Sequence, residues 1–252
     1  NPYVIDSVSR WNDFANDMNT TTSGITNHGA GSYFVLASDL DFSSSTFVRV
    51  NSFSGTFYGL GHTIKNIDLS LGDAAEGGVF ITLSKNVVLA DLNVSNSVFK
   101  DIKSNASLLA VYFSGIGIFN CHTEGRIERE NNLTSAINNV SGIAAAVSVG
   151  ALIYRCSSDL SIKVNQKSNI GPFFGGIVGN AAGDYELKLL NCYANLKLLV
   201  FSSLADCHIG CMIGAAGNKK GNIRFENCVG YMFHSDTHNI PYVHSGALMG
   251  FW

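Results

Sequence analysis

Charged residues are scarce in this sequence. They make up 14% of the 252 residues, and the formal net charge is −3. A compact globule usually carries many Lys and Glu side chains, whereas stacked coils with Asn, Ser and Thr on their outer faces would explain the deficit. Lys and Arg are scattered along the chain, so no basic field exists that would attract nucleic acid. We therefore expect no nucleic-acid partner.

Long apolar runs are missing as well. No run reaches the roughly 18 residues that span a bilayer, since even the stretch 187–204 is interrupted by Asn, Lys and Ser. Two motifs of small-molecule chemistry are also absent: no glycine loop opens a helix to bind nucleotide, and no serine stands in a nucleophile elbow. The sequence predicts no membrane insertion in this segment and no bound cofactor.

What the chain does contain is an internal repeat. Six segments share an apolar residue, a spacer, a turn-forming residue and a second apolar or cysteine residue: Ile64–Ile67, Leu89–Leu92, Ile118–Cys121, Ile153–Cys156, Leu189–Cys192 and Phe225–Cys228. The period begins at about 25 residues and settles at about 36. The turn-forming column consists of Asn66, Asp91, Asn120, Arg155, Asn191 and Asn227. Asn and Asp tolerate a left-handed backbone, so this column predicts a tight bend in each coil, which Arg155 is expected to loosen.

Alternating apolar residues after each bend predict strands. Ile67, Leu69 and Leu71 follow the first bend, and the stretch 192–198 repeats the two-residue period of a half-buried strand. A second block places a small residue before an apolar run, as in Gly142–Ala144 and Gly176–Val178, which adds another inward-facing strand to each coil. Equivalent strands of successive coils would pair in parallel at about 4.8 Å, so that each coil buries the apolar face of its neighbour.

The pattern predicts an all-β fold, a right-handed parallel β-helix (β-solenoid) of about six coils with a short N-terminal α-helical cap. Residues 1–60 are expected to form the cap with its helix and entering strands, and residues 61–252 the solenoid repeats, continuous with the cap as one domain. Within the cap, Ser9–Met18 predicts the helix, with an apolar stripe of Trp11, Phe14, Ala15 and Met18.

Four stretches carry a family resemblance: Tyr33–Phe42, Phe53–Ile67, Gly176–Gly179 and Gly246–Gly250. The first two resemble the lead-in and opening motif of GLUG-type repeat proteins, and the last two resemble the glycine-flanked motif of that family. Tyr58 and Leu60 stand where Asp and an Asn or Asp are common, and Cys211 replaces a glycine. Such repeats occur in bacterial adhesins, immunoglobulin A protease precursors and large surface proteins. The resemblance implies a secreted or cell-surface setting.

Four cysteines share one column of successive coils: Cys121, Cys156, Cys192 and Cys228. Side chains stacked in register run parallel instead of pointing at each other, which disfavours disulfides although the spacing would allow them. We interpret the column as buried free thiols that pack as small apolar groups. For Cys207 and Cys211, a disulfide or a ligand role stays open.

Two groups of residues could hold a metal. The first comprises His234, Asp236, His238 and His244, with His208 on the preceding coil. His-x-x-x-His suits zinc on a helix, but the surrounding residues favour a loop, so surface imidazoles are the preferred interpretation. The second group is Asp39 and Asp41, whose carboxylates share one face of an extended segment and could bind calcium or act as an acid pair. Alternatively, both satisfy backbone groups of the cap, and we expect no metal.

The fold allows three functions. We expect a non-catalytic extracellular adhesion or scaffold segment that binds a host or neighbouring-cell protein or glycan through a solenoid face and loops. The alternative is a carbohydrate-active β-helix enzyme, a polysaccharide lyase or hydrolase, which requires clustered carboxylates or basic groups, whereas the outward positions read mainly as Lys, Ser, Asn and Tyr. A third possibility is a self-associating structural surface or filament component that pairs through the open C-terminal coil, unless Phe251 and Trp252 cover it.

Overall fold

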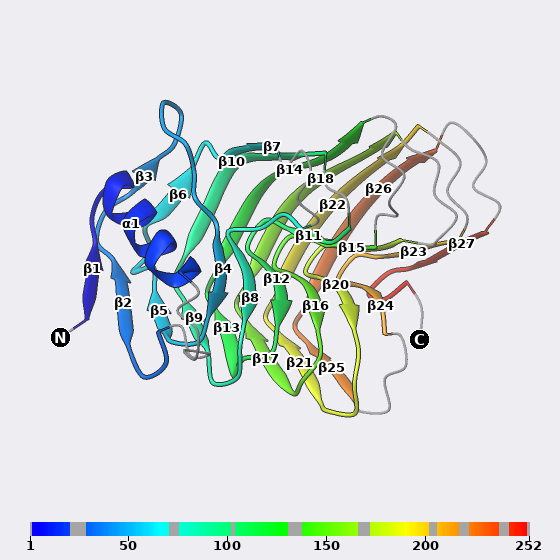
Figure 1. Cartoon of the computed structure of the whole chain (residues 1–252). Coiled ribbons are helices and arrows are strands. Elements are labelled where there is room, and N and C mark those ends of the chain that lie inside the picture. The colour runs from blue at the N-terminus through cyan, green and yellow to red at the C-terminus, as the bar shows by residue number, and fades with distance from the viewer. Residues whose placement is uncertain are drawn as a thin grey trace.

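The computed structural model describes residues 2–20, 29–70, 76–101, 104–130, 138–165, 172–201, 206–216, 222–236 and 242–250. These residues form a parallel β-solenoid of about six turns with one helix at its N-terminal end, as Figure 1 shows. The chain winds through four sheets, here named A to D, and each coil stacks on the preceding one. The predicted fold class is confirmed. Phe251 and Trp252 lie outside the described residues.

Sheets A and B each contain eight strands. Sheet A comprises β1 (Tyr3–Ile5), β2 (Tyr33–Leu36), β5 (Thr56–Tyr58), β9 (Val88–Ala90), β13 (Gly117–Phe119), β17 (Ala151–Tyr154), β21 (Leu187–Leu190) and β25 (Ile223–Glu226). Sheet B comprises β3 (Leu40–Asp41), β6 (Thr63–Lys65), β7 (Asp68–Ser70), β10 (Asn93–Lys100), β14 (His122–Glu130), β18 (Ser157–Asn165), β22 (Tyr193–Val200) and β26 (Val229–Asp236).

Sheets C and D complete the coils. Sheet C comprises β4 (Val50–Phe53), β8 (Phe80–Leu83), β12 (Ala110–Phe113), β16 (Ala144–Val147), β20 (Val178–Ala181) and β24 (Ile213–Ala215). Sheet D comprises β11 (Ala106–Ser107), β15 (Asn139–Ser141), β19 (Phe173–Gly175), β23 (Asp206–Gly210) and β27 (Tyr242–Gly246). From β9 onward the chain passes through sheets A, B, D and C in that order, so residues far apart in sequence meet at equivalent positions of neighbouring coils.

Two-residue alternation fills the interior of the solenoid. In β22, Ala194, Leu196, Leu198 and Val200 point inward and are fully buried, whereas the residues between them face outward. Fully burying one such aliphatic side chain stabilises the fold by about 1.5–3 kcal/mol. Only the outward-facing residues of each strand are therefore available to contact a ligand.

The helix α1 (Val8–Asn19) covers the N-terminal end of the interior. The Ser7 hydroxyl accepts a hydrogen bond from the Arg10 backbone N–H at 3.3 Å and caps the helix start. Trp11, Phe14 and Ala15 are buried, as the apolar stripe predicts. The Trp11 indole N–H donates to the Val48 carbonyl at 2.9 Å, which ties the helix to the chain that leads into β4. Within the described residues, no helix is long and apolar enough to cross a membrane.

The left-handed bends recur along the solenoid. At Asp91, Asn120, Arg155, Asn191 and Asn227, φ lies between 50° and 55°. The prediction that Arg155 loosens its bend is wrong, because its φ of 55° equals that of Asp91 and Asn191. Its guanidinium lies 5.2 Å from the ring centroid of the preceding tyrosine, a stacking contact available to a long side chain that points outward.

The predicted alignment of Asn66 with Asp91 is also wrong. β6 pairs with β10 so that Lys65 lies beside Ser95, and this register places Asn66 beside Asn96. The Asn96 amide donates to the Asn66 side-chain oxygen at 2.5 Å. Asn66 does adopt a left-handed bend, with φ of 60°, but it belongs to a second bend further along the coil.

The cause of the misalignment is an insertion in the first coil. β5 and β9 pair so that Gly59 occupies the position equivalent to Asp91, as its N–H donates to the Ala90 carbonyl at 2.7 Å. Gly59 itself has no positive φ, but the next two residues do, Leu60 at 53° and Gly61 at 81°. The four-residue repeat motif matches Ile64–Ile67 as well as it matches the later coils. It therefore cannot distinguish the bend at Asn66 from the longer turn that begins at Gly59.

The corner between sheets D and C requires glycine in the later coils. A Cβ on Gly175, Gly210 or Gly246 would lie 1.8–2.0 Å from the carbonyl oxygen three residues further along. Strand pairing aligns these glycines with Ser107 and Ser141 of the earlier coils. Because a serine fits at those earlier corners, the turn tightens along the solenoid.

Candidate ligand-binding face

The outer face of sheet B presents side chains in straight rows. Strand pairing places Glu124, Asp159, Asn195 and Tyr231 side by side in one row. A second row, two residues further along each strand, consists of Arg126, Ser161, Lys197 and Phe233. Neighbouring members of a row belong to strands about 4.8 Å apart, so each row runs along the solenoid axis. We call the two rows together the sheet B face.

A bulge in β10 opens a groove on this face. The register between β10 and β14 shifts between Val94 and Ser97, and Asn96 within the bulge has a φ of 46°. Ser97 turns inward and is 1% exposed. A Cβ on Gly125, the residue beside it, would lie 2.4 Å from the Ser97 carbonyl oxygen. A side chain at Gly125 would therefore point into the interior, where Leu108 lies, and collide with the backbone of β10.

The groove has a volume of about 510 Å³. Its lining comes from β10, β14, β18 and β22 and includes Asn96, Glu124, Arg126, Asp159, Ser161, Asn195 and Lys197. Carboxylates, amides, a hydroxyl and two cations therefore line one space. This mixture supplies both hydrogen-bond donors and acceptors over the width of four strands.

The two carboxylates of the groove take part in no ion pair among the described residues. Glu124 and Asp159 lie at directly paired positions of β14 and β18 and both face outward. Arg126 in the neighbouring row instead lies 3.6 Å from Glu128. The two carboxylates are available to accept hydrogen bonds from a ligand.

Aromatic rings adjoin the groove. Tyr193, Tyr231 and Phe233 form what we call the aromatic patch, and 37%, 61% and 57% of their surfaces are exposed. The two tyrosine rings are 6.0 Å apart, and the Lys197 ammonium lies 6.0 Å from the Phe233 ring centroid. Large aromatic side chains rarely stand this exposed in a group unless they serve as a contact surface.

The combination suits a ligand with both hydroxyl groups and apolar C–H faces. Aromatic rings pack against flat apolar surfaces, while Asn, Ser, Asp and Glu side chains exchange hydrogen bonds with hydroxyls. Each sheet strand adds one set of these groups at a repeat of about 4.8 Å. A chain of sugar rings has a comparable repeat, so successive rings could contact successive strands.

The cysteine column lies inside the fold, away from this face. Cys121, Cys156 and Cys192 are buried and Cys228 is partly exposed, and all four are free thiols. The Cys156 thiol donates to the Ile118 carbonyl at 3.4 Å. Burial raises the pKa of Cys156, and a hydrogen bond with Cys228 together with burial raises that of Cys192. Cys207 and Cys211 are also buried, and neither forms a disulfide.

Asp39 and Asp41 accept hydrogen bonds from the cap and from the first coil. Asp39 accepts a hydrogen bond from the Thr63 N–H at 2.9 Å, and this bond lowers the pKa of Asp39. Asp41 accepts from the Asn66 amide at 2.7 Å and from the Ser43 N–H at 2.9 Å. These bonds lower the pKa of Asp41 to about 2. The two carboxylates thus do what the backbone alternative predicts.

Acid should weaken the contacts of Asp41. Since its folded pKa lies below the ordinary value of about 3.9, its contribution is complete above about pH 4 and is lost as the pH falls through about 2. We expect the melting temperature of Asp41→Asn to fall less between about pH 4 and 2 than that of the unmodified protein. Thermal melts across this range test the difference. Asp184→Asn, at an exposed aspartate, is the control and should retain the original pH dependence.

The candidate histidine group does not assemble into a metal site among the described residues. His234 lies on β26 of sheet B, where it pairs with Leu198, and Asp236 ends the same strand. His208 and His244 are paired with each other on sheet D. His238 lies outside the described residues. In the part of the chain that the structure describes, no group of three or more His, Cys, Asp or Glu side chains could hold a metal.

The sheet B face is not predicted from the sequence pattern. From the sequence, the outward positions of the strands are expected to be mainly Lys, Ser, Asn and Tyr. Glu124, Asp159 and Arg126 also lie on the outer face of sheet B. The missing signal is the alternation of β14, in which Thr123 and Ile127 are buried and the residues at 124 and 126 are exposed. If 122–130 had been predicted as one long strand, its alternation would have placed Glu124 and Arg126 on the outer face.

Comparison with known proteins supports the fold. No known family and no curated protein matches the sequence. Among solved structures, the chain is similar to a candidate immunoglobulin A1 protease from Bacteroides ovatus, with 18% identity and a TM-score of 0.54, over 95% of this chain and 77% of that one. It is also similar to a protein named IgA1 protease, with 14% identity and a TM-score of 0.58, over 99% of this chain but 20% of that one. At these identities the likeness shows the β-helical fold alone.

Proposed function

We propose that this chain is a non-catalytic binding segment of a secreted or cell-surface protein, and that it holds a glycan on the sheet B face. The observation that carries the proposal is the groove of about 510 Å³ beside three exposed aromatic rings. Polar groups line the groove on four neighbouring strands, and two of the rings, Tyr231 and Phe233, continue the same two rows. Such a face can contact several units of a polymer at once.

The composition of the face favours a glycan over a protein partner. Protein interfaces have an apolar centre from which Ser, Asp, Glu and Lys are depleted. Here the centre of the face consists of Asp159, Ser161, Asn195 and Lys197, and the rings lie at one end. Hydroxyl-rich ligands can satisfy these polar groups on binding, whereas apolar side chains would leave them unpaired.

An extracellular setting is supported by the resemblance to GLUG-type repeats of surface proteins. The two structural neighbours carry names of proteases that act on immunoglobulin A1. In such a setting the solenoid would act as a rigid spacer that presents the sheet B face to a neighbouring cell or host surface.

The proposal is tested with an array of defined oligosaccharides and the labelled protein. For the tightest oligosaccharide, we expect Tyr231→Ala/Phe233→Ala to bind about 100-fold more weakly, since each lost ring contact is worth roughly 1.4 kcal/mol, a factor of about ten. Titration calorimetry measures the difference. Both side chains are exposed, so the melting temperature should stay nearly constant.

The matched control is Tyr33→Ala on sheet A, since Tyr33 is 57% exposed and Tyr231 is 61% exposed. It should bind the oligosaccharide like the unmodified protein. Equal losses in the control and in the sheet B variant would contradict a specific role of the sheet B face, as would an array without any bound glycan.

The paired carboxylates favour a second candidate, a glycoside hydrolase. Glu124 and Asp159 lie on strands about 4.8 Å apart, close to the separation of about 5–5.5 Å between the carboxyl groups of retaining enzymes. One carboxyl would protonate the leaving oxygen while the other attacks the sugar carbon. Release of new reducing ends from a bound glycan, abolished in Glu124→Gln and retained in Asp184→Asn, would establish this activity over simple binding.

A further inference from the structure

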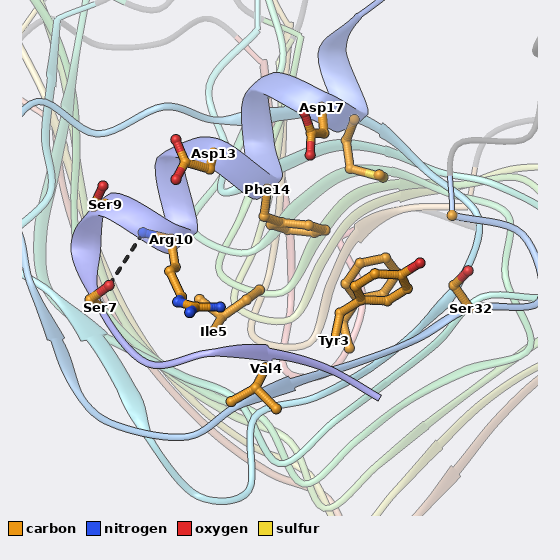
Figure 2. A pocket seen from close by; sticks show the side chains of 13 residues that line it. Tyr3, Val4, Ile5, Ser7, Ser9, Arg10, Asp13, Phe14, Asp17 and Ser32 are labelled. Carbon is orange, nitrogen blue, oxygen red and sulfur yellow. Dashed lines mark hydrogen bonds between the residues drawn. The ribbon is translucent and has the colours of Figure 1, made fainter. Parts of the chain in front are cut away.

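A separate hollow lies at the N-terminal end of the solenoid, between α1 and β1 (Figure 2). It has a volume of about 790 Å³. Its apolar lining includes Ile5, Phe14 and Phe34, which also belong to the buried core, and its rim carries the aspartates of α1. The hollow shares no lining residue with the groove on the sheet B face.

The strand β1 offers an unpaired edge beside this hollow. It is the terminal strand of sheet A and pairs only with β2 among the described residues. The Ile5 carbonyl accepts a hydrogen bond from the Ala37 N–H at 2.8 Å, so the peptide groups of Ile5 point toward β2. Peptide groups alternate in direction along a strand, so the N–H and C=O of Val4 point toward the open edge. They can bond to an added strand.

One aromatic ring on the core side of β1 is left uncovered. Tyr3 and Ile5 lie on the same side of the strand, and Ile5 is 3% exposed. The Tyr3 ring stacks on Phe34 at 5.2 Å, yet 64% of Tyr3 is exposed. Phe34 in turn lies 4.9 Å from the ring of Phe14, and both Tyr3 and Phe14 line the hollow (Figure 2). An apolar side chain of a bound segment would cover the Tyr3 ring.

The rim of the hollow carries two negative charges that do not stabilise the helix. Asp13 and Asp17 are one helical turn apart and repel each other, and Asp17 lies in the last turn, where negative charge opposes the helix dipole. Neither has a basic partner among the described residues, because Arg10 pairs with Asp6 at 3.3 Å. Two carboxylates that destabilise their own helix are suited to a cationic ligand.

We propose that this hollow binds an extended peptide, which adds a strand to β1 through the backbone of Val4. An apolar side chain of the peptide packs on Tyr3 and Phe14, and a Lys or Arg two residues away lies near Asp13 and Asp17. The open edge supplies the backbone bonds, the uncovered ring supplies apolar contact, and the aspartates supply selectivity for positive charge.

Two labelled probe peptides test the proposal, one of alternating valine and lysine and one of alternating valine and glutamate. Fluorescence anisotropy should show that the protein binds the lysine peptide at least tenfold more tightly. Val4→Pro removes the outward N–H and should weaken this binding at least tenfold. Asp13→Asn/Asp17→Asn should remove the preference between the peptides, whereas Asp184→Asn should leave it unchanged.

Equal binding of both peptides, or no binding of either, overturns the proposal. So does full affinity in a Val4→Pro variant whose circular dichroism matches that of the unmodified protein. If Val4→Pro does not fold, the aspartate double variant decides, since its substitutions are on the rim. Self-association in sedimentation that the lysine peptide does not displace would instead assign the edge to a second copy of the chain, and would also overturn the peptide proposal.

Discussion

Gly175→Ala is expected to destabilise the solenoid by about 3 kcal/mol or more, at the upper end of overpacking penalties. The added methyl group would lie 1.8 Å from the Val178 carbonyl oxygen and 2.8 Å from the Gly214 N, both of them backbone atoms. Backbone cannot move aside as a flexible side chain can. Two coils would have to separate locally, and the parallel hydrogen bonds between β19 and β23 would be strained. Urea denaturation measures the loss.

The matched control for this prediction is Ser141→Ala. Ser141 pairs with Gly175 one coil earlier, so the two positions differ mainly in whether a Cβ already fits. The Ser141 hydroxyl is buried without a hydrogen-bond partner among the described residues, so its removal should change the free energy of unfolding by less than about 1 kcal/mol. If Gly175→Ala were as stable as Ser141→Ala, the described corner geometry would be incorrect.

Trp11→Ala should cost about 3–5 kcal/mol of stability, as other Trp truncations in cores do. Trp11 is fully buried and contacts Phe47, Phe57 and Phe80, with ring centroids 5.7–6.1 Å apart. The substitution leaves a large cavity under the helix and removes the donor to the Val48 carbonyl. Since Trp11 joins the helix to the first coils, we expect the N-terminal end to open first.

Hydrogen exchange measured by mass spectrometry tests this order of events. Relative to the unmodified protein, Trp11→Ala should increase the exchange rates of amides in β2 and β5 more than those of amides in β18 and β22. Arg10→Ala on the exposed side of the same helix is the control and should change stability by no more than about 0.5 kcal/mol. A uniform increase in exchange along the whole solenoid would contradict a local role for the helix.

Local chemistry explains how much of this fold can be predicted from the sequence. The left-handed bends at Asp91, Asn120 and Asn191 follow from residue type, since Asn and Asp tolerate positive φ. The helix stripe of Trp11 and Phe14 follows from its period. Each of these features depends on residues within one turn or one bend of the chain.

The register between coils depends on residues that are far apart, which is why the sequence-based alignment misplaces Asn66 and gives no sign of the groove. In the first coil, Leu60 and Gly61 lengthen a turn and move Asn66 out of its expected column. In β10, the bulge at Asn96 shifts the register again and opens the groove. Neither shift has a local signature strong enough to separate it from an ordinary bend.

The candidate site is harder to predict than the fold for the same reason. Glu124 and Asp159 become neighbours only because β14 and β18 pair without a shift over nine residues. Tyr193 and Tyr231 meet diagonally on two different coils. In sequence these residues are isolated polar or aromatic positions, and only strand pairing assembles them into one face.

The proposed function requires that a glycan binds on the sheet B face. Side-chain NMR spectra recorded during titration with the tightest oligosaccharide of the array test it most directly, with each aromatic ring assigned by substitution. We predict that the ring signals of Tyr193, Tyr231 and Phe233 shift in proportion to occupancy, while those of Tyr3 and Tyr33 on sheet A stay fixed. Shifts confined to the sheet A rings, or binding without any shift in the aromatic patch, would contradict the proposed function.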